Sequence, residues 1–125
     1  MNSNIKIIDA LEDTPSISLE KGSLKNIIKI EGVSMPENAF EFYNQLVKEL
    51  TTFFTVLEKI ELHVKLDYMN SMSNKQLLKF IASCFEKDKS LIVYWKYEKM
   101  DELMKIKGQE IVEIYPEINI SLQAY

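Results

Sequence analysis

The chain has 125 residues, of which 46% are hydrophobic and 27% are charged, and its formal net charge is -4. This composition is typical of a soluble globular domain and excludes a disordered chain, so we expect one domain over residues 1–125. The lysines are scattered among Asp and Glu, which argues against a nucleic-acid partner. A single cysteine and a single histidine exclude an internal disulfide and a Cys/His zinc site. We expect no metal and no other cofactor.

The sequence carries no sign of export or membrane insertion. Met1-Asn2-Ser3-Asn4 lacks the basic segment and the apolar run of a signal peptide. No apolar run approaches the roughly 20 residues of a membrane span. We therefore expect a cytoplasmic protein with no membrane partner.

The first elements predicted are an extended segment and a β-hairpin. Residues 1–15 are polar and are expected to be extended or frayed. Ile17–Glu20 and Leu24–Glu31 are rich in β-branched and aliphatic residues, which favours two strands. The glycine of Lys21-Gly22-Ser23 supplies the turn between them.

A helix is predicted next. Ser34 and Glu37 have the spacing of a capping box, and Pro36 suits the first turn of a helix. Apolar residues at helical spacing extend this helix to about Phe54. Its apolar face includes Ala39, Tyr43, Leu46 and Val47.

Residues 60–89 predict a strand, a polar turn and a second helix that ends near Glu86 to Lys89. Apolar and polar residues alternate from Ile60 to Asp67, which indicates a strand with one buried face. From Leu77 onward the apolar residues recur at helical spacing. The turn between the two elements contains Asn70, Ser71, Ser73 and Asn74.

The last elements predicted are two strands with a short helix between them. Ser90–Glu98 forms a strand, with Leu91, Val93, Trp95 and Tyr97 on one side. Asp101 caps the helix, whose pattern Gly108 interrupts. Ile118–Leu122 alternates as a final strand.

This order predicts an α/β fold with a mostly parallel sheet and an N-terminal β-hairpin. Strands separated by helices favour parallel pairing through right-handed crossovers. Parallel strands that are covered on both faces are apolar throughout, whereas these strands alternate. We therefore expect helices mainly on one face, with His63 and Lys65 on the wetter face.

In such a sheet the turns that follow the strands gather at the carboxyl edge, where ligands usually bind. Three turns should meet there: Gly32–Asn38, Asn70–Asn74 and Lys99–Asp101. The residues gathered on this rim would be Pro36, Glu37, Asn38, Asn70, Ser71, Ser73 and Asp101.

Ser71 has two interpretations. It is a favoured residue type for a helix N-cap, and the residues alone favour this plain role. However, Ser73 and Gln76 also have capping-box spacing, and Asn70 is a further candidate cap. If one of these caps the helix, the Ser71 hydroxyl is free to accept a phosphate beside the positive end of the helix dipole.

The sequence shows no catalytic constellation, so we do not expect an enzyme. Cys84 lies on the apolar stripe of its helix, which favours a buried structural thiol. His63 would be its only candidate base, but it is predicted on the face that points away from that helix. No phosphate-binding glycine loop is present among only three glycines.

Several segments together resemble the SiaC-like regulatory phosphoproteins, a small bacterial family related to the STAS domains of anti-sigma-factor antagonists. Ser34–Tyr43 resembles the family segment S-x-P-E-N-x-x-E-F-Y, and Tyr68–Lys75 resembles its turn Y-x-N-T-S-S-x-K. Trp95–Glu98 with Asp101 resembles its W-x-Y-E followed by Asp. The early T-P and a glycine before the first helix match at Thr14-Pro15 and Gly32.

The resemblance implies a STAS-like fold and a non-enzymatic signalling adaptor. A partner serine/threonine kinase would phosphorylate Ser71, and a phosphatase would remove the phosphate. The unmodified form would bind and regulate a diguanylate cyclase or similar protein, which links the switch to cyclic-di-GMP and biofilm formation. The expected partner-binding residues are Met35, Pro36, Glu37, Asn38, Asn70, Met72 and Ser73.

The chain departs from the family pattern at three positions. Ser71 replaces Thr, Met72 replaces Ser, and Gln45 stands where proline is usual. Two alternatives to a phosphorylation switch stay open. One is a small-molecule binder or enzyme that uses the same rim, and the other is a constitutive interaction module in which Ser71 merely caps the helix.

Overall fold

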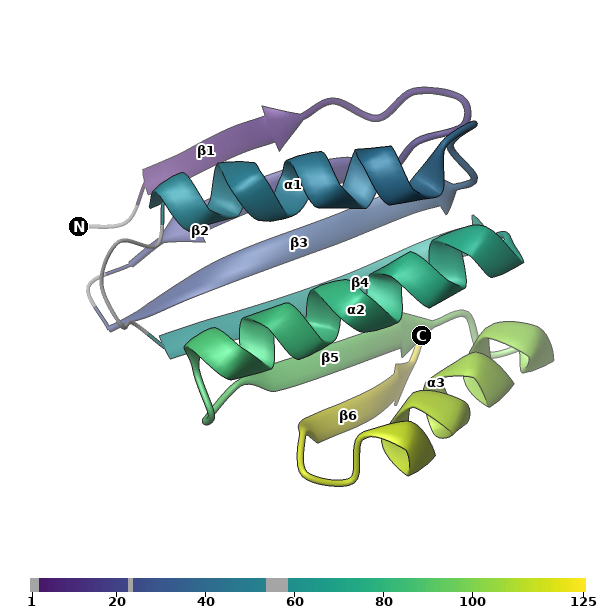
Figure 1. Ribbon diagram of the computed structural model, residues 1–125. Coiled ribbons are helices and arrows are strands. Elements are labelled where there is room, and N and C mark those ends of the chain that lie inside the picture. Colours follow the sequence, from purple (N-terminus) through teal and green to yellow (C-terminus); the bar gives the residue numbers. More distant parts are fainter. Residues whose placement is uncertain (1–2, 23, 54–58) are drawn as a thin grey trace.

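Within the part of the chain that the computed structural model describes, residues 3–22, 24–53 and 59–125, six strands form one sheet (Figure 1). They are β1 (Ser3–Ile8), β2 (Ser16–Lys21), β3 (Lys25–Ser34), β4 (Lys59–Met69), β5 (Ile92–Tyr97) and β6 (Asn119–Ala124). The strands lie in sequence order. The first three pair antiparallel and the last four pair parallel. The predicted hairpin and the mostly parallel sheet are therefore confirmed.

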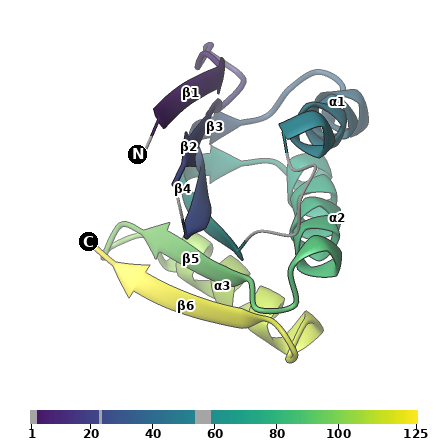
Figure 2. The same ribbon diagram turned by 90° about the vertical axis from the view of Figure 1, so that its left-hand side faces the viewer.

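Three helices follow successive parallel strands: α1 (Ala39–Phe53), α2 (Ser71–Lys87) and α3 (Glu102–Ile114). Figures 1 and 2 show α1 and α2 side by side on one face of the sheet. On that face Ile30, Val64 and Trp95 lie in register and are buried. The next row, Lys29, His63 and Tyr94, faces the opposite side. The prediction of an interior β4 strand with helices on one face is confirmed.

The beginning of α1 differs from the prediction. Ser34 is the last residue of β3, and its hydroxyl hydrogen-bonds to the Tyr43 hydroxyl at 2.7 Å instead of capping a helix. Asn38 takes the cap, because its Oδ1 accepts the backbone N–H of Glu41 at 3.0 Å. The predicted helix end near Phe54 lies outside the described residues, as does Ser23 of the predicted turn.

Residues 3–8 are extended, as one of the two expectations for this segment had it, and they add β1 to the antiparallel edge of the sheet. A second local feature is a β-bulge near the end of β4. The register with β3 slips between Gly32 and Val33, so that Asp67 is an extra residue on β4. Beyond the bulge Met69 is buried and Tyr68 is exposed. Gly32 has φ +116°, a conformation that suits glycine.

Gly108 does not break α3, contrary to the interruption predicted at this position. A Cβ atom there would lie 2.5 Å from Cδ1 of Trp95 on the sheet. The indole Nε1 of Trp95 donates to the carbonyl oxygen of Met104 at 2.9 Å, which fixes the helix against β5. Glycine is therefore required by close packing. None of the described helices is long and apolar enough to cross a membrane.

Candidate functional site

The candidate site is built around the start of α2. Asn70 is the N-cap: its side-chain Oδ1 accepts the backbone N–H of Ser73 at 2.8 Å. Ser73 is fully buried, and its Oγ has no hydrogen-bond partner among the described residues. A cap by Ser73 with Gln76 is therefore wrong, and Asn70 is confirmed as the cap. Ser71 is the first residue of the helix and is exposed.

Two of the three predicted turns meet at this point. β3 and β4 end side by side, with Ser34 opposite Met69, and the N–H of Asn70 donates to the carbonyl oxygen of Ser34 at 3.1 Å. Met35 follows directly and is held by its N–H to the carbonyl oxygen of Asp13 at 2.8 Å. The Asn70–Asn74 turn thus adjoins the Gly32–Asn38 turn.

The third turn follows β5 at the same edge. Asp101 caps α3, because its Oδ1 accepts the N–H of Met104 at 3.1 Å. Among the described residues no hydrogen bond or ion pair joins Asp101 to the other two turns. The rim therefore consists of a close pair of turns around Ser71 and a separate turn at Asp101.

The side chains at the close pair of turns differ in exposure. Met72 is 58% exposed and Met35 is 38% exposed, whereas Pro36 and Ser73 are buried. Glu37 and Asn38 are exposed. The expected partner-binding residues therefore divide into exposed side chains and buried ones that support the turns.

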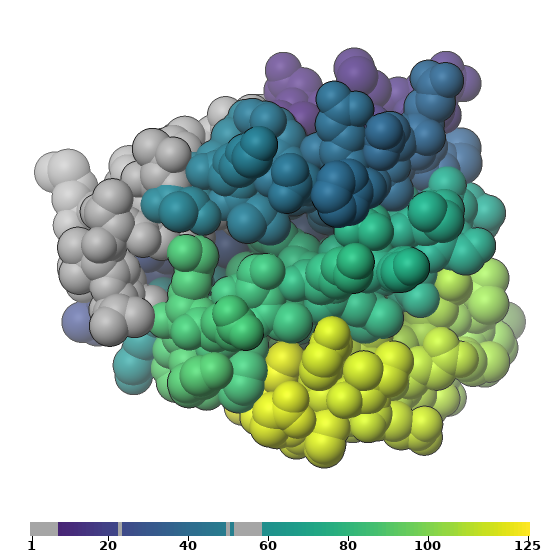
Figure 3. Space-filling model, in the orientation of Figure 1, coloured from purple at the N-terminus to yellow at the C-terminus, as the bar shows by residue number. Residues whose placement is uncertain are grey.

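Phe40 was not among the predicted site residues, although it is 58% exposed on the first turn of α1. The available signal was its position off the apolar face that includes Ala39 and Tyr43. Phe40 also lines a groove of about 210 Å³ between α1 and α2, together with Gln76 and Phe80. Figure 3 shows this face, with the blue atoms of α1 beside the green atoms of α2. We call Met35, Phe40 and Met72 the apolar rim.

The start of α2 favours a negative group. The first turn of α2 contains no acidic residue. The first intrahelical hydrogen bond runs from Asn74 N–H to the Asn70 carbonyl oxygen, so the N–H groups of Ser71 and Met72 precede it. Such N–H groups and the helix dipole attract anions. Lys75, one turn further on, is exposed.

Cys84 and His63, which the sequence did not favour as a catalytic pair, lie away from this surface. Cys84 is only 4% exposed, and its burial raises the pKa of the thiol to about 12, which makes it a poor nucleophile. His63 lies on the opposite face of the sheet, where its Nε2 donates to Oε1 of Glu61 at 2.8 Å. A Cys–His pair is therefore not formed. Burial also raises the pKa of Tyr43 to about 12.

Metal binding receives no support from the described side chains, which contain no cluster of three or more His, Cys, Asp or Glu residues suited to an ion.

Comparison with known proteins points to one family. The model of the SiaC family regulatory phosphoproteins matches residues 8–125. No curated protein sequence matches the chain.

Solved structures share the fold. A chain in the crystal structure of the diguanylate cyclase SiaD in complex with its activator SiaC from Pseudomonas aeruginosa has a TM-score of 0.77 and 22% sequence identity. The similarity covers 97% of this chain and 99% of that chain. The crystal structure of apo-SiaC from the same organism has a TM-score of 0.75 and 21% identity, with coverage of 98% and 99%.

Proposed function

Because the chain belongs to the SiaC family of regulatory phosphoproteins, we propose that it is an adaptor switched by phosphorylation of Ser71. A partner serine/threonine kinase adds the phosphate and a phosphatase removes it. The unmodified protein binds and regulates a diguanylate cyclase, as SiaC of Pseudomonas aeruginosa is an activator of the cyclase SiaD. The chain itself performs no catalysis.

The observation that carries the proposal is that Asn70 caps α2, which leaves the Ser71 hydroxyl without a capping role. Asn70 makes the capping hydrogen bond to Ser73 N–H. Ser71 is therefore not needed as a cap, and it presents an exposed hydroxyl at the first helical position. A kinase needs such an accessible hydroxyl, whereas the neighbouring Ser73 is fully buried.

The partner surface that we propose is the apolar rim with the exposed Glu37 and Asn38. Met35, Phe40 and Met72 are apolar side chains that lose exposed surface when a partner covers them, which favours binding. Phosphorylation of Ser71 places about -1.5 to -2 charges next to Met72. A partner that packs on this rim must then desolvate the phosphate, which weakens the complex.

The test is phosphorylation and capture in native lysate, with Ser71→Ala and Ser73→Ala as a matched pair. Both variants remove one hydroxyl from the same turn. We expect intact-mass analysis to show a single phosphate on the wild type and on Ser73→Ala, and none on Ser71→Ala. We expect the cyclase to be captured by Ser71→Ala and to be lost or strongly reduced with Ser71→Asp.

Two results would contradict the proposal. One is a phosphate that persists on Ser71→Ala, which would place the modification elsewhere. The other is equal capture of the cyclase by all variants, which would make the protein a constitutive interaction module.

A further inference from the structure

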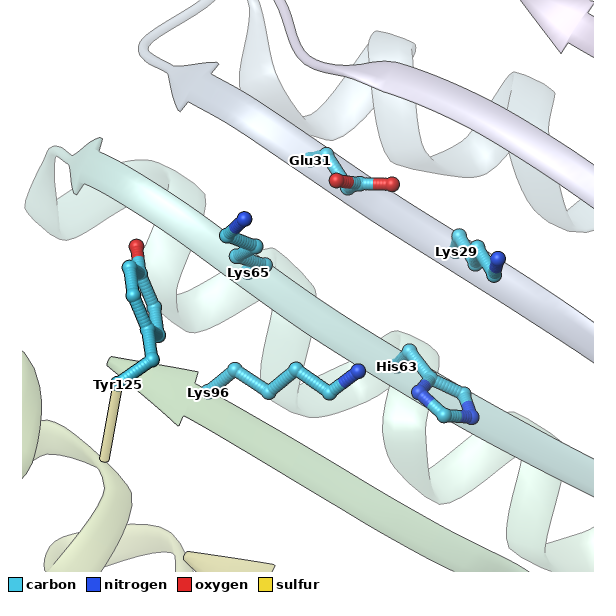
Figure 4. Close-up of a pocket in the computed structure, with 6 residues that line it drawn as sticks. All are labelled: Lys29, Glu31, His63, Lys65, Lys96 and Tyr125. Carbon is cyan, nitrogen blue, oxygen red and sulfur yellow. The ribbon is translucent and has the colours of Figure 1, made fainter. Parts of the chain in front are cut away.

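A second feature lies on the face of the sheet that the helices leave uncovered. A hollow of about 330 Å³ is present there (Figure 4). Its residues come from β3, β4, β5 and the segment after β6. They are Lys29, Glu31, His63, Lys65, Lys96 and Tyr125.

The hollow concentrates positive charge in a chain whose net charge is -4. Three lysines line it, one from each of three neighbouring strands, and Glu31 is the one acidic side chain among the lining residues. No carboxylate of the described residues lies within ion-pair distance of Lys29, Lys65 or Lys96. Three ammonium groups line the hollow beside one acidic side chain, and this excess of positive charge favours an anion bound among them.

A further carboxylate on this face, that of Glu61, is already engaged. Glu61 accepts from Lys25 Nζ at 2.7 Å through one oxygen and from His63 Nε2 at 2.8 Å through the other. These partners lower the pKa of Glu61 although its burial opposes this. Glu61 therefore fixes the imidazole rather than neutralising the lysines.

His63 offers an unused polar atom at the hollow. Its ring stacks on Tyr94 with a centroid distance of 4.7 Å, and its Nε2 is bonded to Glu61. Its Nδ1 is buried and has no hydrogen-bond partner among the described residues. Figure 4 shows the side chain of Lys96 extending along the sheet toward this ring. Because Nε2 carries the proton that is donated to Glu61, Nδ1 is an acceptor, and a donor such as a ligand hydroxyl group would satisfy it.

We propose that this hollow binds a small molecule that carries a phosphate or diphosphate group. The phosphate oxygens accept from the lysine ammonium groups. Tyr125, whose ring lies 4.8 Å from Lys65 Nζ, forms an aromatic wall at one side. Glu31 on the opposite wall suits a hydroxyl group of the same ligand. This proposal does not depend on the switch at Ser71, which lies on another part of the protein.

A small ligand fits this face better than an acidic segment of a protein. The volume is at the lower end of the range for small-molecule sites, which begins at about 300 Å³. The cores of protein interfaces are depleted of charged residues and contain large apolar side chains, whereas four of the six lining residues are Lys or Glu.

The experiment is calorimetric titration of the purified, unmodified chain with pyrophosphate and, separately, with ADP at low ionic strength. The test variant is Lys65→Gln with Lys96→Gln. The control variant is Lys79→Gln with Lys105→Gln, which removes the same charge from α2 and α3. Circular dichroism verifies that all variants are folded.

We expect the wild type and the control to bind at least one probe, and the test variant to bind it at least about tenfold more weakly, because two charge-assisted hydrogen bonds are lost. Tighter binding of ADP than of pyrophosphate would identify a nucleotide, and equal binding would identify the diphosphate group alone.

Three results would overturn the proposal. The first is the absence of binding heat with both probes. The second is equal weakening in the test and control variants. The third is binding of an oligoglutamate peptide by a protein that binds neither probe, which would assign the face to an acidic protein partner.

Discussion

The starts of α2 and α3 are built alike but differ in charge. Each helix follows a parallel strand at the same edge of the sheet, and each is capped by a side-chain oxygen. Asn70 accepts from Ser73 N–H at 2.8 Å, and Asp101 accepts from Met104 N–H at 3.1 Å. The residue after the cap is a neutral serine, Ser71, in α2 and an acidic residue, Glu102, in α3.

α3 therefore shows what a negative charge does at the position that Ser71 occupies in α2. The helix forms with Glu102 in its first turn, as expected from the helix dipole. The second helical residues are also comparable, since Met72 and Leu103 are both apolar and exposed. Since α3 accommodates a negative side chain at this position, we expect α2 to accommodate a phosphate on Ser71, and under our proposal the phosphate then acts on the partner that covers the apolar rim.

The comparison holds only if the bodies of both helices stay docked on the sheet, and Cys84 reports this for α2. Burial raises the pKa of its thiol to about 12, so the native protein at about pH 8 contains far less thiolate than the unfolded chain. We expect alkylation of native Cys84 to be slower by at least about 100-fold. A Ser83→Cys/Cys84→Ala variant, with its thiol at a less buried position, is the control and should react quickly. Native and unfolded chains that react at similar rates would refute a docked α2.

A substitution at Gly108 tests whether α3 is packed against β5. Alanine is a better helix former than glycine by about 1 kcal/mol, but its Cβ would lie 2.5 Å from Cδ1 of Trp95. We expect Gly108→Ala to lower the free energy of unfolding by about 1–3 kcal/mol, as for other overpacked sites. Urea denaturation measures this, with the exposed neighbour Gln109→Ala as the control. A stabilised Gly108→Ala variant would show that α3 is not held against β5 at this distance.

Asn70 and Asp101 should contribute similarly to the free energy of unfolding if the starts of α2 and α3 are equivalent. We expect Asn70→Ala and Asp101→Ala each to lower the free energy of unfolding by about 1 kcal/mol, because each leaves one N–H of the first turn without its partner. Asn74→Ala, in the same turn but not at the cap, should change stability by less than about 0.5 kcal/mol. A negligible effect at Asn70 would indicate that Ser71 or Ser73 takes over the cap, which would weaken the case for a free Ser71 hydroxyl.

The smallest effects should come from the charges themselves. We expect Ser71→Asp to leave stability unchanged or raise it by about 0.3–1 kcal/mol, and Glu102→Gln to lower it by a similar amount. Both effects should shrink as salt is added, because these residues are exposed. Thermal denaturation at low and high salt measures them. Loss of more than about 1 kcal/mol in Ser71→Asp would mean that a charge at this position disturbs the fold.

Much of the fold could be predicted from the sequence because alternation reports which face of a strand is buried. The pattern from Ile60 to Asp67 predicted an interior β4 strand covered on one side, and it placed His63 and Lys65 on the open face. The hollow on that face was not predictable. It depends on the register that sets Lys29 opposite His63 and Lys65 opposite Lys96, which local spacing does not contain.

The helix caps at the candidate site also depend on tertiary contacts that local sequence spacing does not contain. Ser34 had the right spacing for a cap, but its hydroxyl is used by Tyr43, a residue that the fold brings within 2.7 Å. At α2 the sequence offered Asn70, Ser71 and Ser73 as caps without a way to choose among them. The bulge at Asp67 shifts the burial phase beyond it, so that Met69 and not Tyr68 is buried and Asn70 begins the turn.

The central claim is that phosphate on Ser71 changes partner binding and leaves the fold intact. The most direct measurement is calorimetric titration of the partner cyclase with the unmodified chain and with the chain that carries authentic phosphoserine at position 71. Urea denaturation of both forms accompanies it. The account predicts that phosphorylation weakens binding by at least about tenfold, since an unpaired charge must be desolvated, while the free energy of unfolding changes by less than about 1 kcal/mol. Equal affinity of both forms for the cyclase, or loss of binding that coincides with unfolding of the phosphorylated chain, would contradict it.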